Sequence, residues 1–142
     1  MRTLPEPIAA LIRHARNGAL FESNARASFA QEGEDLVVDR LFDGQHPGFF
    51  VDVGAHHPTR YSNTALLSKR GWRGINIDAT PGSMAAFRKK RPSDINLEVA
   101  VSSEPGALLL HRFDQPALNT LSEQLTAARV AAGDGSVVEV VE

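Results

Sequence analysis

The stretch that most constrains the fold runs from Gly48 to Asp78 and reads GFFVDVGAHHPTRYSNTALLSKRGWRGINID. Two short, largely apolar runs enclose a glycine turn and a helix-like segment, and an acidic residue stands at or near the end of each run. This pattern predicts a strand, a tight turn, a short helix and a second strand. Because strands joined by a helical crossover pair in parallel, the stretch predicts an α/β sheet that can hold a nucleoside at the carboxyl ends of its strands.

A helix and a third strand are expected to follow. Thr80-Pro81 offers a cap and a proline at the first helical position, so we expect a helix that begins there and ends before Pro92. Its inward-facing residues are expected to be Met84 and Phe87.

The order of the strands follows from their polarity. Residues 95–101 alternate between apolar and polar side chains, as do residues 75–78, whereas residues 49–53 are nearly continuously apolar. Central strands of a covered sheet are apolar on both faces, and strands nearer an edge alternate. With right-handed crossovers, these patterns predict a parallel sheet of order 3-2-1.

Further elements are expected on both sides of this unit. We divide the chain into an N-terminal helix with a connector, residues 1–27, and a main domain, residues 28–142. The expected elements are helices over residues 8–15, 32–42 and 119–131 and strands over residues 107–113 and 137–141.

Composition excludes several classes of protein. The 142 residues suit one domain, and a net charge of −2 lacks the basic excess of a general nucleic-acid binder. The chain has no cysteine, which rules out disulfides and cysteine-based zinc sites. No apolar run approaches the ~20 residues of a membrane span, and the first residues do not resemble a signal peptide. We therefore expect no nucleic-acid partner, no membrane association and a cytoplasmic location.

The candidate site lies where the first two strands end. Gly54, in Asp52-Val53-Gly54-Ala55, follows the first strand, and a glycine there lets the backbone approach a ligand; a plain turn explains it equally well. Asp78 follows Gly54 by 24 residues, close to the spacing of a ribose-binding acid. The alternative role for Asp78 is to cap the next helix. Taken together, the two features favour a nucleoside site.

The residues of the turn after Gly54 indicate which kind of nucleoside the site could hold. A dinucleotide site uses G-x-G-x-x-G so that pyrophosphate can rest on bare backbone. Here Gly54 is followed by Ala55, His56, His57 and Pro58, which leave little room for pyrophosphate. A nucleoside without phosphates, such as S-adenosylmethionine, fits better, and a nicotinamide-dependent oxidoreductase is disfavoured.

Four collinear segments resemble the FkbM family of S-adenosylmethionine-dependent methyltransferases. The resemblance implies a Rossmann-like class I methyltransferase fold, S-adenosylmethionine as cofactor, and O-methylation of a saccharide or another small-molecule hydroxyl. The segments are SFAQEGEDLVVDRLF (28–42), GFFVDVGAHHPTRYSNT (48–64), GWRGINIDATP (71–81) and INLEVAVSSEPG (95–106), with a weaker match at LNTLS (118–122).

The resemblance also implies roles for individual residues. Asp52, Gly54 and Ala55 match the cofactor turn, and Asp78 matches the acid on the ribose diol. Val101 and Ser102 fall where the adenine ring is usually lined. Gln31, Glu34 and Asp35 match a motif ahead of the first strand, where one of them, Gln31 in our assignment, would border the methionine end. The alternative for these three is a solvated first turn of helix.

The neighbouring histidines, His56 and His57, invite two further interpretations. Adjacent residues in an extended turn point apart, so we expect no metal site. One histidine could line the substrate mouth and act as a general base, or both could pack within the turn. The sequence identifies no catalytic residue.

Family members usually continue beyond the region that matches residues 137–142 into a strand with a D-x-E-G motif. We therefore expect residues 28–142 to be a partial methyltransferase domain, truncated before its second half, with an unpaired edge on the first strand. The strand at 137–141 could fill that gap, a second copy could fill it in a homodimer, or the chain could be a fragment. The alternative function is a catalytically silent interaction or assembly module.

Overall fold

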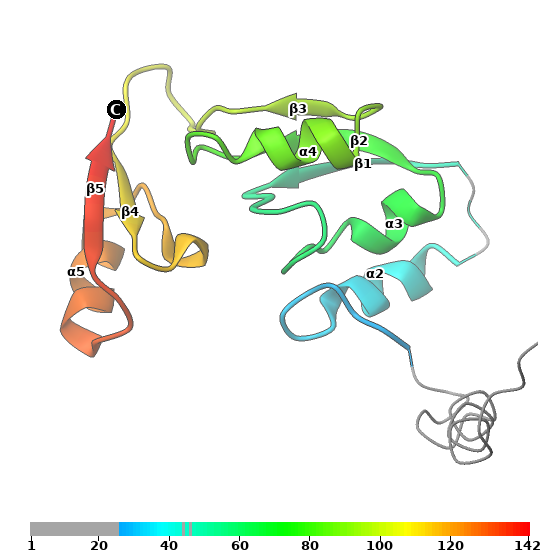
Figure 1. The fold of residues 1–142 in the computed structure, drawn as a ribbon, viewed down its shortest axis with the longest axis horizontal. Helices are drawn as coiled ribbons and strands as arrows, with labels where there is room; N and C mark the ends of the chain where they lie inside the picture. Colours follow the sequence, from blue (N-terminus) through cyan, green and yellow to red (C-terminus); the bar gives the residue numbers. More distant parts are fainter. Residues whose placement is uncertain (1–25, 44, 46) are drawn as a thin grey trace, which may run out of the picture.

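The computed structural model describes residues 26–43, 45 and 47–142, and these form a mixed α/β structure (Figure 1). The helix predicted over residues 8–15 lies outside the described residues. In chain order the elements are α2 (Glu34–Leu41), β1 (Phe49–Val53), α3 (Ala65–Lys69), β2 (Arg73–Ile77), α4 (Met84–Lys90), β3 (Ile95–Leu97), β4 (Leu110–Phe113), the 3-10 helix η1 (Pro116–Leu118), α5 (Glu123–Ala132) and β5 (Val137–Val141).

The first three strands form a parallel sheet in the order β1-β2-β3. The predicted order, 3-2-1, describes the same arrangement from the opposite edge, because β2 lies between the other two. Val53 pairs with Ile77 and Ile77 pairs with Leu97, so the three carboxyl ends lie level at one edge. Parallel strands joined by helices are compatible with a Rossmann-like fold.

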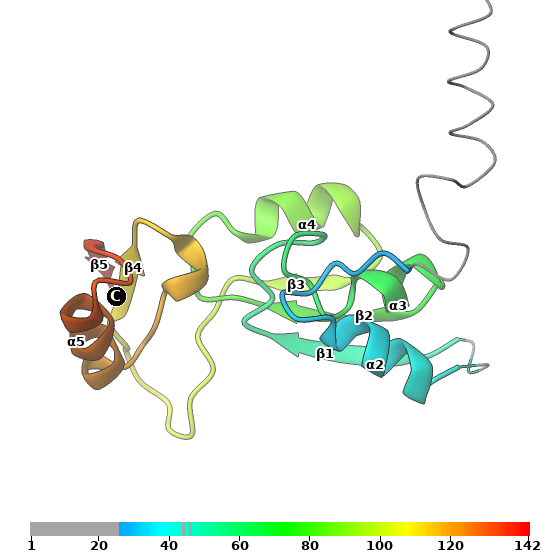
Figure 2. The same ribbon diagram turned by 90° about the horizontal axis from the view of Figure 1, so that it is seen from below.

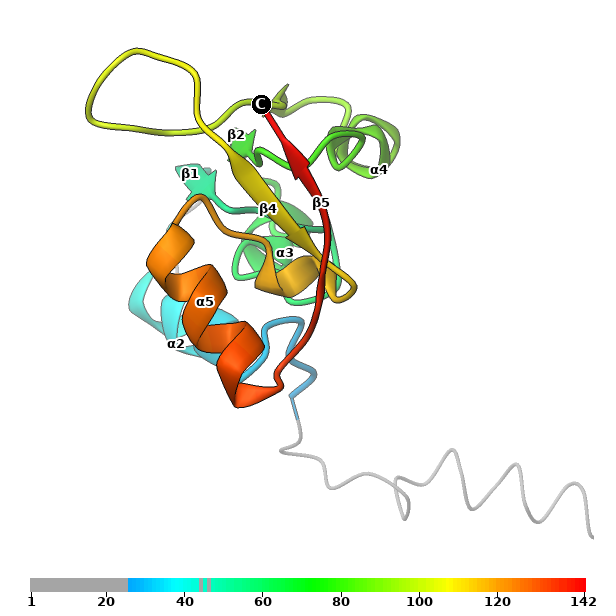
Figure 3. The ribbon, with the colours of Figure 1, turned by 90° about the vertical axis from the view of Figure 1, so that its left-hand side faces the viewer.

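The last two strands form a separate antiparallel pair, β4-β5, accompanied by α5 (Figure 3). The hypothesis that residues 137–141 fill the gap beside β1 is therefore wrong, because β5 pairs with β4. We call β1, β2 and β3 with α2, α3 and α4 the parallel unit, and β4, η1, α5 and β5 the antiparallel unit. The carboxyl ends of the parallel strands face the antiparallel unit (Figures 1 and 2).

Three elements of the parallel unit are shorter than predicted, and the first is α2, which covers Glu34–Leu41 instead of residues 32–42. The third strand ends at Leu97 instead of Val101, because β2 ends at Ile77 and offers no partner beyond that point. The helix expected from Thr80-Pro81 begins only at Met84, since Gly82 has φ +81° and the preceding residues form a turn.

The antiparallel unit also differs from prediction at its boundaries. β4 begins at Leu110 instead of Ala107, and α5 covers Glu123–Ala132 instead of residues 119–131. The helix begins late because the Ser122 hydroxyl caps it, accepting a hydrogen bond from the amide of Leu125 at 3.2 Å.

The core of the parallel unit lies on one face of its sheet. One cluster contains Phe50, Leu67 and Trp72, and a second contains Ala55, Met84 and Phe87; the last two are the residues predicted to face inward. Gly74 makes the packing possible, because a Cβ there would lie 2.3 Å from the Phe50 ring.

The other face of this sheet is bare among the described residues. Phe49, Val51 and Val53 are about 60% exposed, and Ile95 and Leu97 are exposed as well. The prediction that β1 is buried on both faces is therefore wrong. The helices of the parallel unit pack against the opposite face, so alternate residues of β1 meet solvent.

Helix α2 buries acids instead of apolar residues. Asp35 and Asp39 are buried, whereas Val37 and Leu41 are exposed. Asp39 is paired with Arg26 and with Arg70, which explains how a carboxylate can face inward.

Candidate functional site

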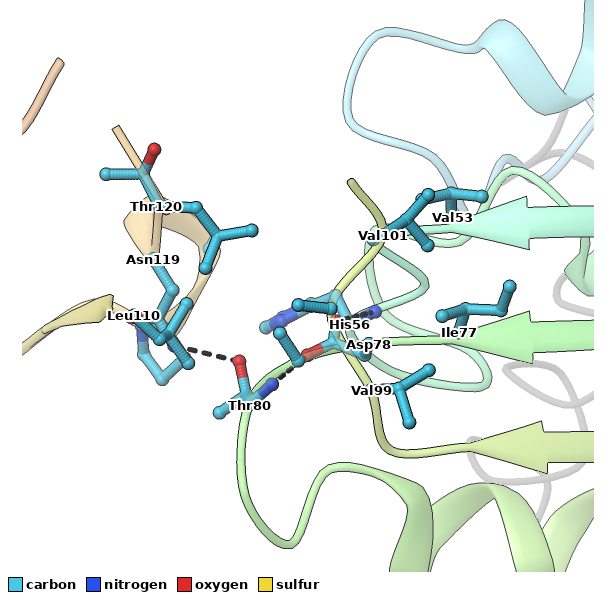
Figure 4. Close-up of a pocket in the computed structure, with 16 residues that line it drawn as sticks. Val53, His56, Ile77, Asp78, Thr80, Val99, Val101, Leu110, Asn119 and Thr120 are labelled. Carbon is cyan, nitrogen blue, oxygen red and sulfur yellow. Dashed lines mark hydrogen bonds between the residues drawn. The ribbon is translucent and has the colours of Figure 1, made fainter. Parts of the chain in front are cut away.

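A cavity of about 380 Å³ lies at the carboxyl edge of the parallel sheet, between the two units (Figure 4). Val53 and Gly54 line it at the end of β1, and Ile77 and Asp78 line it at the end of β2. Residues 99–101 and 116–121 complete the walls. Its size lies within the range of small-molecule sites, roughly 300–1,000 Å³.

The bend after β1 forms one side of this cavity. Gly54 has φ +75°, a conformation that suits glycine, and a Cβ there would project into open space. The amides of Gly54 and Ala55 both donate to the carbonyl oxygen of Ile77, at 2.9 and 3.0 Å. The bend is therefore tied to the neighbouring strand and leaves the space above Gly54 free for a ligand.

Asp78 joins the bend to the loop after β2. Its Oδ2 accepts a hydrogen bond from the His56 amide, and its Oδ1 accepts one from the Thr80 amide, both at 2.8 Å. It does not cap α4, which begins six residues later. Two carboxylate oxygens offer about four lone-pair sites, so Asp78 can still accept hydrogen bonds from a ligand.

Two more of the predicted residues lie near the cavity, and one lies apart from it. Val101 belongs to the cavity wall. Ala55 is buried in the core with Met84 and Phe87, beneath the bend. Asp52 is separate, because neighbouring residues of a strand face opposite ways; its Oδ2 accepts a hydrogen bond from the Thr64 hydroxyl at 2.7 Å.

The remaining predicted residues lie outside the cavity lining. Ser102 and Gln31 are both exposed. Asp35 lies in the first turn of α2 but is buried, so the alternative of a solvated turn fails for this residue; it accepts hydrogen bonds from the Ser28 hydroxyl at 2.6 Å and the Phe29 amide at 2.7 Å. The segment ahead of β1 is thus held by Asp35, and none of its residues lines the cavity.

The far wall of the cavity was not among the predicted site residues. Asn119 accepts a hydrogen bond from the Phe113 amide at 2.9 Å and donates one to the Thr80 hydroxyl at 3.0 Å, which links the two units. The weak LNTLS match, residues 118–122, was the signal in the sequence that could have identified this wall.

The two histidines occupy different environments. His57 packs within the turn, where its Nδ1 accepts hydrogen bonds from the amides of Thr59 and Arg60 at 3.1 and 3.0 Å. His56 has φ +55°, stacks on Tyr61 with ring centroids 6.0 Å apart, and lines the cavity. Among the described residues, no cluster of three or more potential ligands could hold a metal ion.

The electrostatics of the turn keep both imidazoles neutral near pH 7. Burial lowers the pKa of His56, Arg60 lowers it further, and Asp78 opposes the shift. Burial also lowers the pKa of His57, and the cations around it act in the same direction. A neutral imidazole can accept a proton, which is what a general base requires.

A buried arginine fixes the loop between β1 and α3. Arg91 donates hydrogen bonds to the hydroxyls of Thr64 at 2.9 Å and Ser62 at 3.1 Å, to Asn76 Oδ1 at 3.3 Å, and to the Pro58 carbonyl. Burial lowers the pKa of its guanidinium, while Asp94 and Asp52 oppose the shift. One residue at the end of α4 therefore positions the loop that carries the bend.

Comparisons with known proteins yield no relative: no protein-family model matches the chain, and neither the curated proteins nor the solved structures contain a match. In the part of the chain that the structure describes, no helix has both the length and the apolar character of a membrane span.

Proposed function

We propose that this chain binds S-adenosylmethionine at the carboxyl ends of β1 and β2, in a class I methyltransferase fold of the FkbM type. The observation that carries the proposal is the position of Asp78, which is hydrogen-bonded to the bend and lines the same cavity as Gly54. A carboxylate beside a bare-backbone bend is the arrangement that suits a ribose diol.

The residues that line the cavity suit an adenosine. Asp78 would accept hydrogen bonds from the ribose hydroxyls, and Gly54 would admit the ligand against the backbone. Ile77, Val99 and Val101 would enclose the adenine ring with apolar side chains. The proposed site leaves out three residues that the resemblance assigned to the cofactor: Ser102, Gln31 and Asp52.

The proposed reaction is O-methylation of a saccharide or another small molecule. When bound, S-adenosylmethionine supplies an electrophilic methyl group that a substrate hydroxyl displaces. The role of this chain is to bind and orient the nucleoside, and His56 offers a neutral imidazole at the cavity for the hydroxyl proton.

Calorimetric titration with S-adenosylhomocysteine tests the proposal. The wild-type protein should bind it and should not bind NADH, and Asp78→Asn should weaken binding at least about tenfold through loss of a charged acceptor. Asp114→Asn is the matched control, because Asp114 accepts hydrogen bonds from two backbone amides but lies outside the cavity. Equal affinity for Asp78→Asn and the wild type would remove Asp78 from the site.

The bare sheet face favours a second candidate, an interaction or assembly module without catalytic activity. Five exposed apolar residues of β1 and β3 share that face, and such a patch marks an interaction surface. A homodimer would cover it. Sedimentation that shows a stable dimer, from a protein that does not bind S-adenosylhomocysteine, would support this candidate over the methyltransferase.

A further inference from the structure

A second hollow, of about 260 Å³, adjoins the nucleoside cavity. It is formed by the loop after β1, with His56, His57 and Arg60, and by the loop after β2, from Thr80 to Ser83. Four residues line both spaces: His56, Asp78, Thr80 and Pro116. The proposed function assigns no ligand to this hollow.

Three side chains around the hollow carry hydrogen-bond donors: His57, Arg60 and Ser83. Because Nδ1 of His57 accepts two backbone amides, the proton of its neutral ring lies on Nε2. Arg60 forms no ion pair with any carboxylate of the described residues, and its guanidinium lies 5.8 Å from the centre of the Tyr61 ring. The Ser83 hydroxyl oxygen is buried and has no hydrogen-bond partner among the described residues.

The lining of the hollow carries one cationic side chain, Arg60, and one carboxylate, Asp78. Arg60, Lys90 and Arg91 all lie close enough to lower the pKa of His57. Asp78 accepts the amides of His56 and Thr80 and also lines the nucleoside cavity, where the proposed function assigns its remaining acceptor sites to the ribose. Lys90 and Arg91 are hydrogen-bonded to Thr59 and Thr64, whereas the Arg60 guanidinium has no hydrogen-bond or ion-pair partner among the described residues and remains available to a ligand.

We propose that this hollow binds an oxyanion, the phosphate or carboxylate group of a small-molecule ligand. Arg60 supplies the charge, since its planar guanidinium matches the geometry of both groups. The Ser83 hydroxyl and His57 Nε2 supply two further donors. The proposal does not depend on which nucleoside occupies the neighbouring cavity.

Titration of the full chain with inorganic phosphate, and separately with acetate, tests the proposal by two-dimensional NMR. Phosphate should shift the signals of Arg60 and Ser83 saturably and should raise the pKa of His57, because an anion stabilises the imidazolium. Acetate, as a single carboxylate, distinguishes the two sources of the oxyanion. Tighter binding of phosphate would indicate a ligand with a phosphate group, and tighter binding of acetate would indicate a ligand with a carboxylate.

Arg60→Gln should weaken phosphate binding at least about tenfold, because one charge-assisted pair is lost. Arg73→Gln is the matched control, since Arg73 is an exposed arginine at the opposite end of β2 and should leave the affinity unchanged. Ser83→Ala should cause a smaller loss. Equal affinity for Arg60→Gln and Arg73→Gln, or no saturable shift with either anion, would overturn the proposal.

The nucleoside proposal is judged separately on the same samples. Phosphate binding without S-adenosylhomocysteine binding would leave the oxyanion site in place and remove the methyltransferase assignment. The reverse result would remove only the oxyanion site.

Discussion

The two walls of the cavity are built in different ways. The parallel unit holds its wall with buried polar groups, Asp78 and Arg91, over a core that includes Met84 and Phe87. The antiparallel unit buries only Leu110 and Phe113, and α5 has no buried side chain. The wall from the parallel unit can position a ligand before it binds, because its polar groups are buried and hydrogen-bonded. The wall from the antiparallel unit is supported by fewer buried residues. Specific recognition should therefore reside in the parallel unit.

The largest expected effect compares core side chains of the two units. Phe87→Ala should lower the free energy of unfolding by about 3–5 kcal/mol, because the ring is fully buried. Leu125→Ala, in the exposed α5, should lower it by less than about 1 kcal/mol. Urea denaturation measures both, and a similar loss for the two variants would contradict the difference between the units.

A second pair of variants compares arginines that bind backbone carbonyls. Arg91→Met should lower the free energy of unfolding by about 3 kcal/mol, because buried acceptors of Pro58, Ser62 and Thr64 lose their donor. Arg129→Met, which removes a donor to the Leu118 carbonyl in the antiparallel unit, should cost about 1 kcal/mol or less. Arg91→Lys should recover part of the loss. If Arg91→Met is as stable as Arg129→Met, the loop does not depend on this residue.

Variants at two glycines, Gly54 and Gly133, distinguish an effect on stability from an effect on ligand binding. Gly54 and Gly133 have nearly the same positive φ, and a Cβ at either would meet no atom within 4 Å. Alanine at each position should therefore cost a similar amount of stability, about 1 kcal/mol. Only Gly54→Ala should also weaken binding of S-adenosylhomocysteine, because its Cβ would enter the cavity. Equal affinities for the two variants would show that the ligand does not approach the bend.

The same contrast explains what could be predicted from the sequence. β1 and β5 have the predicted bounds, because runs of apolar residues flanked by turn residues define a strand locally. The position of Asp78 beside Gly54 followed from parallel pairing, since neighbouring strands bring their carboxyl ends together.

Other features depend on partners that a local pattern does not contain. Asp39 is buried because Arg70, 31 residues away, lies against it. Asn119 reaches the cavity through a hydrogen bond to Thr80, 39 residues earlier in the chain. The third strand ends early because its neighbour, β2, ends at Ile77, and the sequence of the third strand itself does not contain this information. The buried acids were therefore beyond local reasoning, and the weak LNTLS match was the one local signal of the far wall, whereas the bend followed from the pattern around Gly54.

The smallest expected effect is a pH dependence confined to the parallel wall. The pKa of His56 is lowered in the folded protein, so the unfolded chain binds more protons below the ordinary histidine pKa of about 6.5. The stability tied to a neutral His56 is thus fully present above that pH and is lost as the pH falls through the lowered pKa. His56→Gln should reduce the decline in urea midpoint between about pH 7 and pH 5. An unchanged decline would show that the ring contributes no proton linkage, and the neutral imidazole proposed at the cavity would lose its support.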